Sequence, residues 1–213
     1  SVGPLNLKAD EVQNGLGRIS SQTDLTAVID TLQQQGGALV AQGNLSLTGS
    51  VLDNRNGGLV GTTKALDLQV GQIDNRMGEL SAGLGVKVGA QRLDNSDGGK
   101  LIAGNALELK VAQLINQTKG LIHAQGGLTL TGSTLDNSAG SLSSLEALVI
   151  TLDNALLNNK GLISSEGALT VNAGSLDNTA GSLGSAGALS LLSTGGLTNQ
   201  GGSISTDDAL TLK

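Results

Sequence analysis

The chain offers little nucleophilic chemistry, because its 213 residues include one histidine, His123, and no cysteine. Acyl transfer through a serine or cysteine nucleophile needs an adjacent base, most often histidine. His123 follows Ile122, which we expect to point into a core, so the imidazole should face solvent. We interpret His123 as a surface residue without a catalytic role.

Carboxylates are the other groups that could do chemistry. Enzymes that cleave polysaccharides can carry their carboxylates and basic residues on long loops that protrude from a parallel β-helix. A sequence pattern recurs in this chain every 20 or 21 residues and leaves no room for a loop of that length. The phrase Asp94-Asn95-Ser96-Asp97-Gly98 resembles a calcium loop superficially, yet it lacks the spacing and the terminal glutamate of an EF-hand. We therefore predict no enzyme activity, no metal site and no cofactor.

Basic residues are concentrated in the middle of the sequence, although the net charge is −6. Residues 55–119 hold eight Lys or Arg against six Asp or Glu, whereas residues 120–213 hold two against seven. Arg55 and Arg76 occupy equivalent places in neighbouring repeats and could contact an acidic glycan. Mixed charges that maintain solubility are the simpler interpretation. The stacking residues and basic field of a nucleic-acid binder are missing.

An asparagine that recurs every 20 or 21 residues organises the whole sequence. It stands each time in the pattern aliphatic-x-Asn, with a glutamine in one repeat. These ten anchor residues are Asn14, Gln34, Asn54, Asn75, Asn95, Asn116, Asn137, Asn158, Asn178 and Asn199. So regular a period predicts an array of equivalent units with no inserted loops.

Within each unit, apolar residues alternate with polar ones, as in Leu45-Ser46-Leu47 and Leu128-Thr129-Leu130. A period of two predicts half-buried strands. A unit of about 20 residues made of short strands cannot cover its own apolar face, whereas a stack of units can. We therefore predict an all-β fold, a parallel β-helix of about ten coils that rises roughly 4.8 Å per coil.

We expect each anchor residue to mark a corner. A glycine that follows it, such as Gly78, suits a corner that needs a positive φ. The residue five positions after the anchor should return to the core, as Leu59 and Leu121 would. Lys100 breaks this rule with Leu101 beside it, which predicts a one-residue bulge.

Stacked amides would satisfy the polar groups at these corners, because an asparagine side chain both donates and accepts hydrogen bonds. We favour this structural role for the anchor residues over a metal or glycan role. Gln34 has a longer side chain and should extend the ladder imperfectly. We expect irregular structure near residues 20–38.

The composition fits a narrow solenoid. The sequence has no Phe, Tyr, Trp or Cys and contains 33 glycines, which predicts a lumen filled by Leu, Ile, Val and Ala. No stretch resembles a signal peptide or a transmembrane helix. Both ends fall in strand patterns without the polar caps of solenoids. We therefore predict that residues 1–213 are a single β-helical array within a longer filament, with any export signal outside it.

Several phrases resemble the repeats of filamentous haemagglutinins over residues 5–213. They are Leu52-Asp53-Asn54-Arg55-Asn56-Gly57-Gly58-Leu59, Leu135-Asp136-Asn137-Ser138-Ala139-Gly140-Ser141-Leu142 and the segment 161–171. Similar repeats form the stalks of contact-dependent growth-inhibition toxins. The resemblance implies a right-handed parallel β-helix that a two-partner-secretion transporter exports across the outer membrane of a Gram-negative bacterium.

The resemblance also suggests the function. We predict a secreted or cell-surface segment of structural or adhesive character, a rigid spacer that presents distal binding or toxin modules. The alternative is an adhesin module that itself recognises a glycan or receptor on a host cell or a neighbouring bacterium, with Arg55 and Arg76 as contacts. A polysaccharide-cleaving β-helix enzyme is the third hypothesis.

Overall fold

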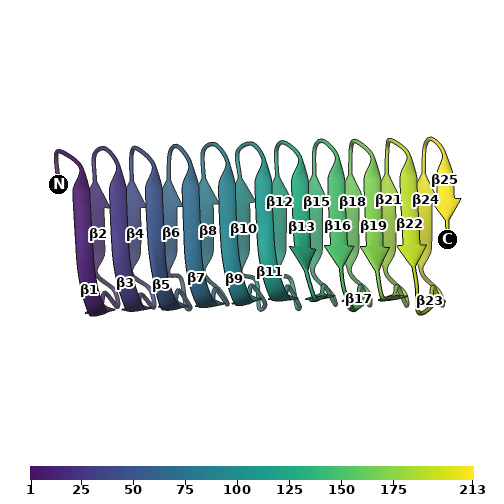
Figure 1. Ribbon diagram of the computed structural model, residues 1–213, viewed down its shortest axis with the longest axis horizontal. Coiled ribbons are helices and arrows are strands. Elements are labelled where there is room, and N and C mark those ends of the chain that lie inside the picture. The colour runs from purple at the N-terminus through teal and green to yellow at the C-terminus, as the bar shows by residue number, and fades with distance from the viewer.

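The computed structural model describes all residues from 1 to 213, and it is a parallel β-solenoid of about ten coils without any helix. The coils stand side by side along one axis, with the two termini at opposite ends (Figure 1). No helix exists that could span a membrane. The predicted all-β stack of coils is confirmed.

One sheet contains the long strand of every coil, and its strands pair in parallel in sequence order. In the first six coils this strand is unbroken: β1 (Leu5–Gln13), β3 (Leu25–Gln33), β5 (Leu45–Asp53), β7 (Leu66–Asp74), β9 (Val86–Asp94) and β11 (Leu107–Ile115). In later coils it is divided: β13 (Leu128–Gly132) and β14 (Thr134–Asp136), β16 (Leu148–Leu152) and β17 (Ala155–Leu157), β19 (Leu169–Ala173) and β20 (Ser175–Asp177), β22 (Leu189–Ser193) and β23 (Leu197–Thr198), then β25 (Leu210–Leu212). Gly, Asp and Asn, which disfavour strands, occupy most of the divisions.

The second sheet contains one four-residue strand from each coil. These strands are β2 (Arg18–Ser21), β4 (Ala38–Ala41), β6 (Leu59–Thr62), β8 (Glu79–Ala82), β10 (Lys100–Ala103), β12 (Leu121–Ala124), β15 (Ser141–Ser144), β18 (Leu162–Ser165), β21 (Ser182–Ser185) and β24 (Ser203–Thr206). They also pair in parallel in sequence order. Each coil is therefore hydrogen-bonded to both neighbours through two opposed sheets.

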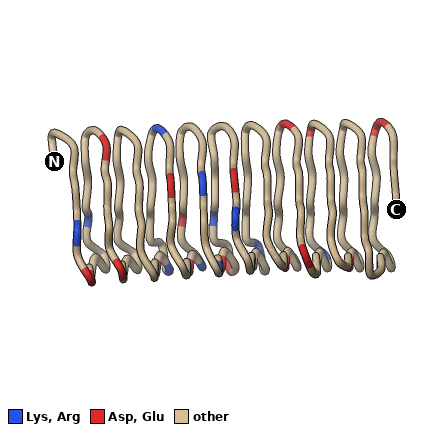
Figure 2. The backbone as a smooth tube through the Cα atoms, in the orientation of Figure 1, with Lys and Arg blue, Asp and Glu red and all other residues tan.

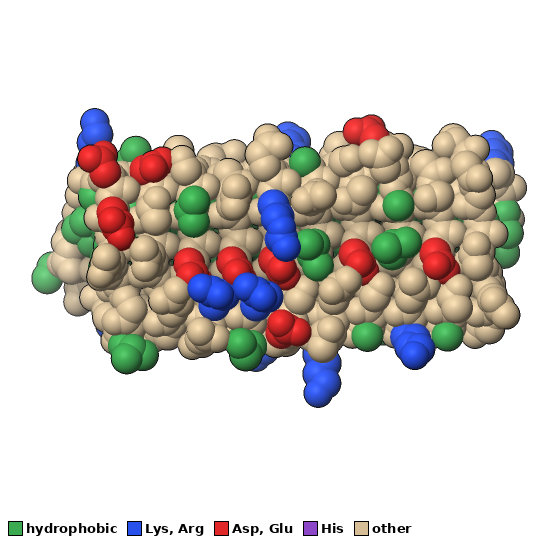
Figure 3. All heavy atoms as spheres, turned by 90° about the horizontal axis from the view of Figure 1, so that it is seen from below, with side chains coloured by type: hydrophobic (Ala, Val, Ile, Leu, Met, Phe, Trp, Pro, Cys, Tyr) green, Lys and Arg blue, Asp and Glu red, His purple; other side chains and the backbone are tan.

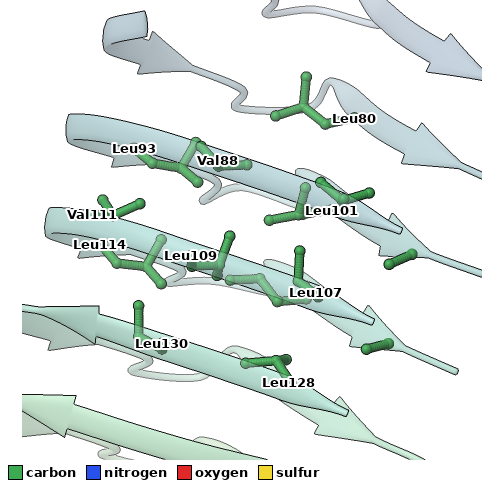
Figure 4. Close-up of a cluster of buried hydrophobic side chains, with 14 of the residues drawn as sticks. Leu80, Val88, Leu93, Leu101, Leu107, Leu109, Val111, Leu114, Leu128 and Leu130 are labelled. Carbon is green, nitrogen blue, oxygen red and sulfur yellow. The ribbon is translucent and has the colours of Figure 1, made fainter. Parts of the chain in front are cut away.

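The core is a column of aliphatic side chains between the two sheets, with 43 buried apolar residues. Equivalent residues lie in register, so that Leu107 pairs with Leu128 and Leu109 pairs with Leu130. Figure 4 shows these leucines stacked from coil to coil. The aliphatic residue two positions before the anchor is buried from Leu32 to Leu176, as the repeated pattern predicts. In the terminal coils it is not, because Val12 is half-buried and Leu197 is 40% exposed.

The corners after the anchors differ in length by one residue, which corrects part of the sequence interpretation. The corners after Asn54, Asn95 and Asn116 are the longer ones. The residues that enter the core after them are Val60, Leu101 and Ile122. The prediction that Leu59 and Leu121 face the core was wrong, because both are only half-buried. Lys100 is not a bulge either, since it pairs in register with Glu79 and Leu121; the extra residue lies in the corner.

Residues 20–38 are regular, contrary to expectation. β3 pairs in register with β1 and β5 along most of its length. The run Val28-Ile29 fits the alternation because Ile29 is buried and Val28 faces outward. The sheet is therefore undisturbed over residues 20–38.

Positive φ falls on the residue before the corner glycine and not on the glycine that we expected. Met77 and Ala139 have φ of 57° and 55°, whereas Gly78 and Gly140 are not among the residues with positive φ. Glycine is needed there for space, because a Cβ on Gly140 would overlap the main-chain oxygen of Asn116 in the preceding coil. The glycine column thus allows close approach between coils.

Thr118 is the residue with the least suitable side chain at these left-handed positions. Its φ is 50°, and a β-branched residue is strained in that region. Thr118→Asn should therefore raise the free energy of unfolding by about 1 kcal/mol, since asparagine tolerates this conformation. Chemical denaturation compared with Gln117→Asn, at the neighbouring position, would measure the gain; an unchanged midpoint would show that the corner relaxes around threonine.

Candidate functional site: an amide ladder and the charged corner beside it

The anchor side chains form one continuous series of hydrogen bonds along the solenoid. From Asn54 to Asn199, each Nδ2 donates to the Oδ1 of the next anchor over 2.7 to 2.8 Å. Eight consecutive anchors, Gln34 to Asn178, are completely buried. The ladder therefore links successive coils through amides that water does not reach.

Each anchor from Asn14 to Asn178 also bonds to the second sheet of the next coil. Asn75 Nδ2 lies 3.0 Å from the carbonyl oxygen of Lys100, the first residue of β10. The same contact recurs from Asn116 to Ser141 over 3.0 Å. The ladder thereby provides hydrogen-bond donors to carbonyl groups at the start of the second-sheet strands. No buried side-chain polar atom lacks a hydrogen-bond partner.

Gln34 keeps the ladder continuous with longer bonds. Its side chain accepts from Asn14 over 3.2 Å and donates to Asn54 over 3.3 Å. It also donates to the carbonyl oxygen of Leu59 over 2.8 Å. The additional methylene is therefore accommodated without loss of a partner.

An aspartate that precedes the anchor in five coils is a structural residue that our sequence reasoning missed. Its Oδ1 accepts the main-chain N–H two residues later, over 3.0 Å for Asp136 and Asp177 and 3.3 Å for Asp53. This is the Asx turn that Asp favours. The Asp-Asn dipeptide that recurs in the sequence could have predicted this turn.

Buried serines at the opposite corner form a second group that was missed. The hydroxyls of Ser144, Ser165 and Ser185 donate to carbonyl oxygens two residues later over 2.6 to 2.9 Å. They replace the alanine found at this position in coils such as that of Ala103. The change from alanine to serine along this column becomes visible only when the strands of the second sheet are aligned in register.

The two arginines proposed as a contact patch are held by carboxylates. Arg55 binds Asp53 through Nε and Nη2 over 2.8 and 2.7 Å, and Arg76 binds Asp74 in the same way over 3.0 and 2.7 Å. Figure 3 shows basic side chains lying against a row of acidic ones on this face. The cations are therefore largely neutralised.

The pairs join into a network across three coils. Arg55 Nε lies 3.5 Å from Asp74 Oδ2 and Arg76 Nε lies 4.0 Å from Asp94 Oδ2, while Arg92 contacts Asp94 over 3.0 Å. The hydrogen bond from Arg55 lowers the pKa of Asp53 below its ordinary value of 3.8. The hydrogen bond that Arg76 donates to Asp74 raises the pKa of Arg76.

These contacts predict a pH-dependent contribution to stability. The folded pKa of Asp53 is depressed, so the stabilisation is present above pH 3.8 and is lost as the pH falls through the lower folded pKa. Asp53→Asn should cost about 1 kcal/mol at pH 7, because the pair is partly exposed. Chemical denaturation of the original protein and the variant should show a smaller difference in the free energy of unfolding at pH 3 than at pH 7. An equal difference at both pH values would show that ionised Asp53 is not the source of the stabilisation.

The other candidate residues are not brought together into a catalytic or metal site. His123 lies on the outer side of β12, half-buried, with Nδ1 2.9 Å from Ser143 Oγ in the next coil. Asp94 is occupied by Arg92, while Asp97 is exposed at the corner with φ of 56°. No group of three His, Cys, Asp or Glu side chains is placed to hold a metal ion.

The charged residues divide the rod into two halves. In the N-terminal half, charges lie on the faces of the sheets as well as the corners, whereas in the C-terminal half they gather at corners and bends (Figure 2). Lys87 and Lys110 flank Glu108 over 3.8 and 2.7 Å. One surface groove is lined mainly by polar residues, among them Arg18 and Glu79.

Comparison with known proteins gives one family. A family model described as haemagglutinin repeat matches residues 1–55, 50–111, 85–160 and 150–213, ranges that overlap and reach both ends. No curated protein and no solved structure gives a match.

Proposed function

The chain belongs to the haemagglutinin-repeat family, and on that premise we propose that it is a rigid segment of a secreted surface filament. It would hold distal binding or toxin modules away from a Gram-negative cell. The observation that carries the proposal is continuity, because both sheets and the amide ladder pass through every coil. A spacer needs stiffness along its axis and a length set by the number of coils.

Cell binding tests the spacer against the adhesin. The labelled protein should show no saturable binding to epithelial cells or to neighbouring bacteria above that of an equally charged β-helix control. Saturable binding above the control would replace the spacer by an adhesin module.

The Arg55 and Arg76 patch can be tested in the same assay by two opposed variants. If the arginines contact a glycan, Arg55→Ser with Arg76→Ser should abolish binding. Asp53→Asn with Asp74→Asn should strengthen it, because these changes free the guanidinium groups from their carboxylates. Equal binding by both variants would exclude the patch.

We further propose that a two-partner-secretion transporter exports the protein and that coils fold as they emerge. Every coil can template on the preceding one, since each strand pairs with its equivalent in the next coil. Truncation from the C-terminal end in steps of one coil should leave the remaining coils folded by circular dichroism. Folding that survives only when the C-terminal coils are kept would contradict this order.

A further inference from the structure

Two Asn-Gly dipeptides occur in the sequence, and the fold places them in opposite situations. Asn14-Gly15 begins the amide ladder, whereas Asn56-Gly57 forms the tip of a long corner. Asparagine followed by glycine is the sequence most prone to spontaneous loss of the side-chain amide, because glycine carries no side chain to hinder the attack of its nitrogen. The pair therefore allows a comparison within one molecule.

The side chain of Asn14 is held in place. It is 8% exposed, and its Nδ2 donates to Gln34 Oε1 and to the carbonyl oxygen of Ala38, each over 3.2 Å. The carboxamide carbon cannot turn toward the nitrogen of Gly15 without breaking both bonds. The ladder thus protects this asparagine.

The side chain of Asn56 makes no hydrogen bond and is exposed, as is Gly57. Both residues have a left-handed backbone, with φ of 57° and 84°. The tip is restrained only through its backbone, where the N–H groups of Asn56 and Gly57 donate to Arg76 and Met77 of the next coil over 3.1 and 2.8 Å. No atom lies within 4 Å of the place where a Gly57 Cβ would stand, so the tip is open to solvent around this peptide. For the ring to close, the N–H of Gly57 must first leave the carbonyl oxygen of Met77.

From this contrast we infer that Asn56 is a site of spontaneous deamidation and that Asn14 is not. The nitrogen of Gly57 attacks Cγ of Asn56; the new N–Cγ bond closes a succinimide ring, the Cγ–Nδ2 bond breaks, and ammonia leaves with the proton of the amide. One water molecule then opens the ring. Cleavage of the N–Cγ bond gives aspartate, and cleavage of the backbone C–N bond gives isoaspartate. The chemistry is independent of the spacer or adhesin role.

Aspartate and isoaspartate differ in how they fit the corner. Asp97-Gly98 occupies the equivalent corner two coils away, with φ of 56° and 80° and the same bond from Gly98 N–H to the next coil. An aspartate at position 56 therefore fits the existing corner. Isoaspartate lengthens the backbone by one carbon, which moves Gly57 N–H from its acceptor on Met77 and loosens the corner between the third and fourth coils.

Peptide mapping by mass spectrometry after incubation at 37 °C and pH 8.5 tests the inference. In the folded protein we expect Asn56 to convert at least tenfold faster than Asn14, while in 8 M urea the two should convert at similar rates. Asn56→Gln should remove the signal, since the longer side chain does not form the five-membered ring readily. Equal rates at Asn14 and Asn56 in the folded protein, or no conversion at Asn56, would overturn the inference.

Discussion

Replacing Asn95 by alanine in the middle of the ladder should destabilise the solenoid by about 3 to 5 kcal/mol, because several buried polar groups lose their partner. Asn95 accepts from Asn75 and donates to Asn116, over 2.7 and 2.8 Å. It also bonds to the carbonyl oxygens of Gly99 and Leu121, both over 3.1 Å. The change leaves these groups buried without water and opens a cavity.

Chemical denaturation followed by circular dichroism, together with hydrogen exchange at the adjacent coils, would measure this loss. Repeat arrays do not always unfold in one step, so hydrogen exchange shows whether the damage is confined to the altered corner. Asn199→Ala is the matched control. It should cost less than about 1 kcal/mol, because the side chain is exposed at the end of the ladder and leaves little buried. Equal effects at both positions would refute the proposed role of the buried amides.

Replacing Gly140 by alanine should cost about 4 kcal/mol or more, since the added Cβ meets main-chain atoms that cannot move aside. The Cβ would overlap the oxygen of Asn116 and lie 2.9 Å from Asn137 Oδ1. To make room, the corner must move away from the preceding coil. That movement would break the bond of Asn116 to Asn137 as well.

Gly184→Ala is the control for this substitution. Gly184 lies inside β21, its nearest neighbour would be Ser205 Oγ at 3.8 Å, and its φ is not positive. Alanine there should stabilise the strand by about 0.5 to 1 kcal/mol through reduced conformational entropy of the unfolded state. Urea midpoints for the two variants should move in opposite directions; parallel shifts would show that glycine is not required at Gly140 for space.

The sequence was sufficient for the period, the strands and most of the buried aliphatic positions. Each coil packs on coils of similar sequence, so equivalent residues have equivalent surroundings. The anchor spacing and the alternation seen in one repeat, as in Leu128-Thr129-Leu130, therefore predict the strands of every repeat. The family match agrees with the resemblance seen in the repeats.

The corners were harder to predict, because their geometry depends on the neighbouring coil. The need for glycine at position 140 arises from a carbonyl oxygen 24 residues earlier in the sequence, which local sequence rules do not consider. Leu59 and Leu121 were assigned to the core because a fixed distance from the anchor was assumed, whereas these corners carry one more residue. The main partners of Arg55 and Arg76 lie only two residues away, and they were missed for a different reason, because Asp53 and Asp74 were read only as part of the repeat.

The direction of the strand hydrogen bonds has a mechanical consequence. They run parallel to the long axis of the rod, from each coil to the next, so a force applied to the two ends loads the coils in series. The coils should then peel away singly rather than shear together. Each release would replace a rise of roughly 4.8 Å by a stretched segment of 20 or 21 residues, roughly 70 Å long. Such a rod could absorb a pull by lengthening in steps while the remaining coils stay folded.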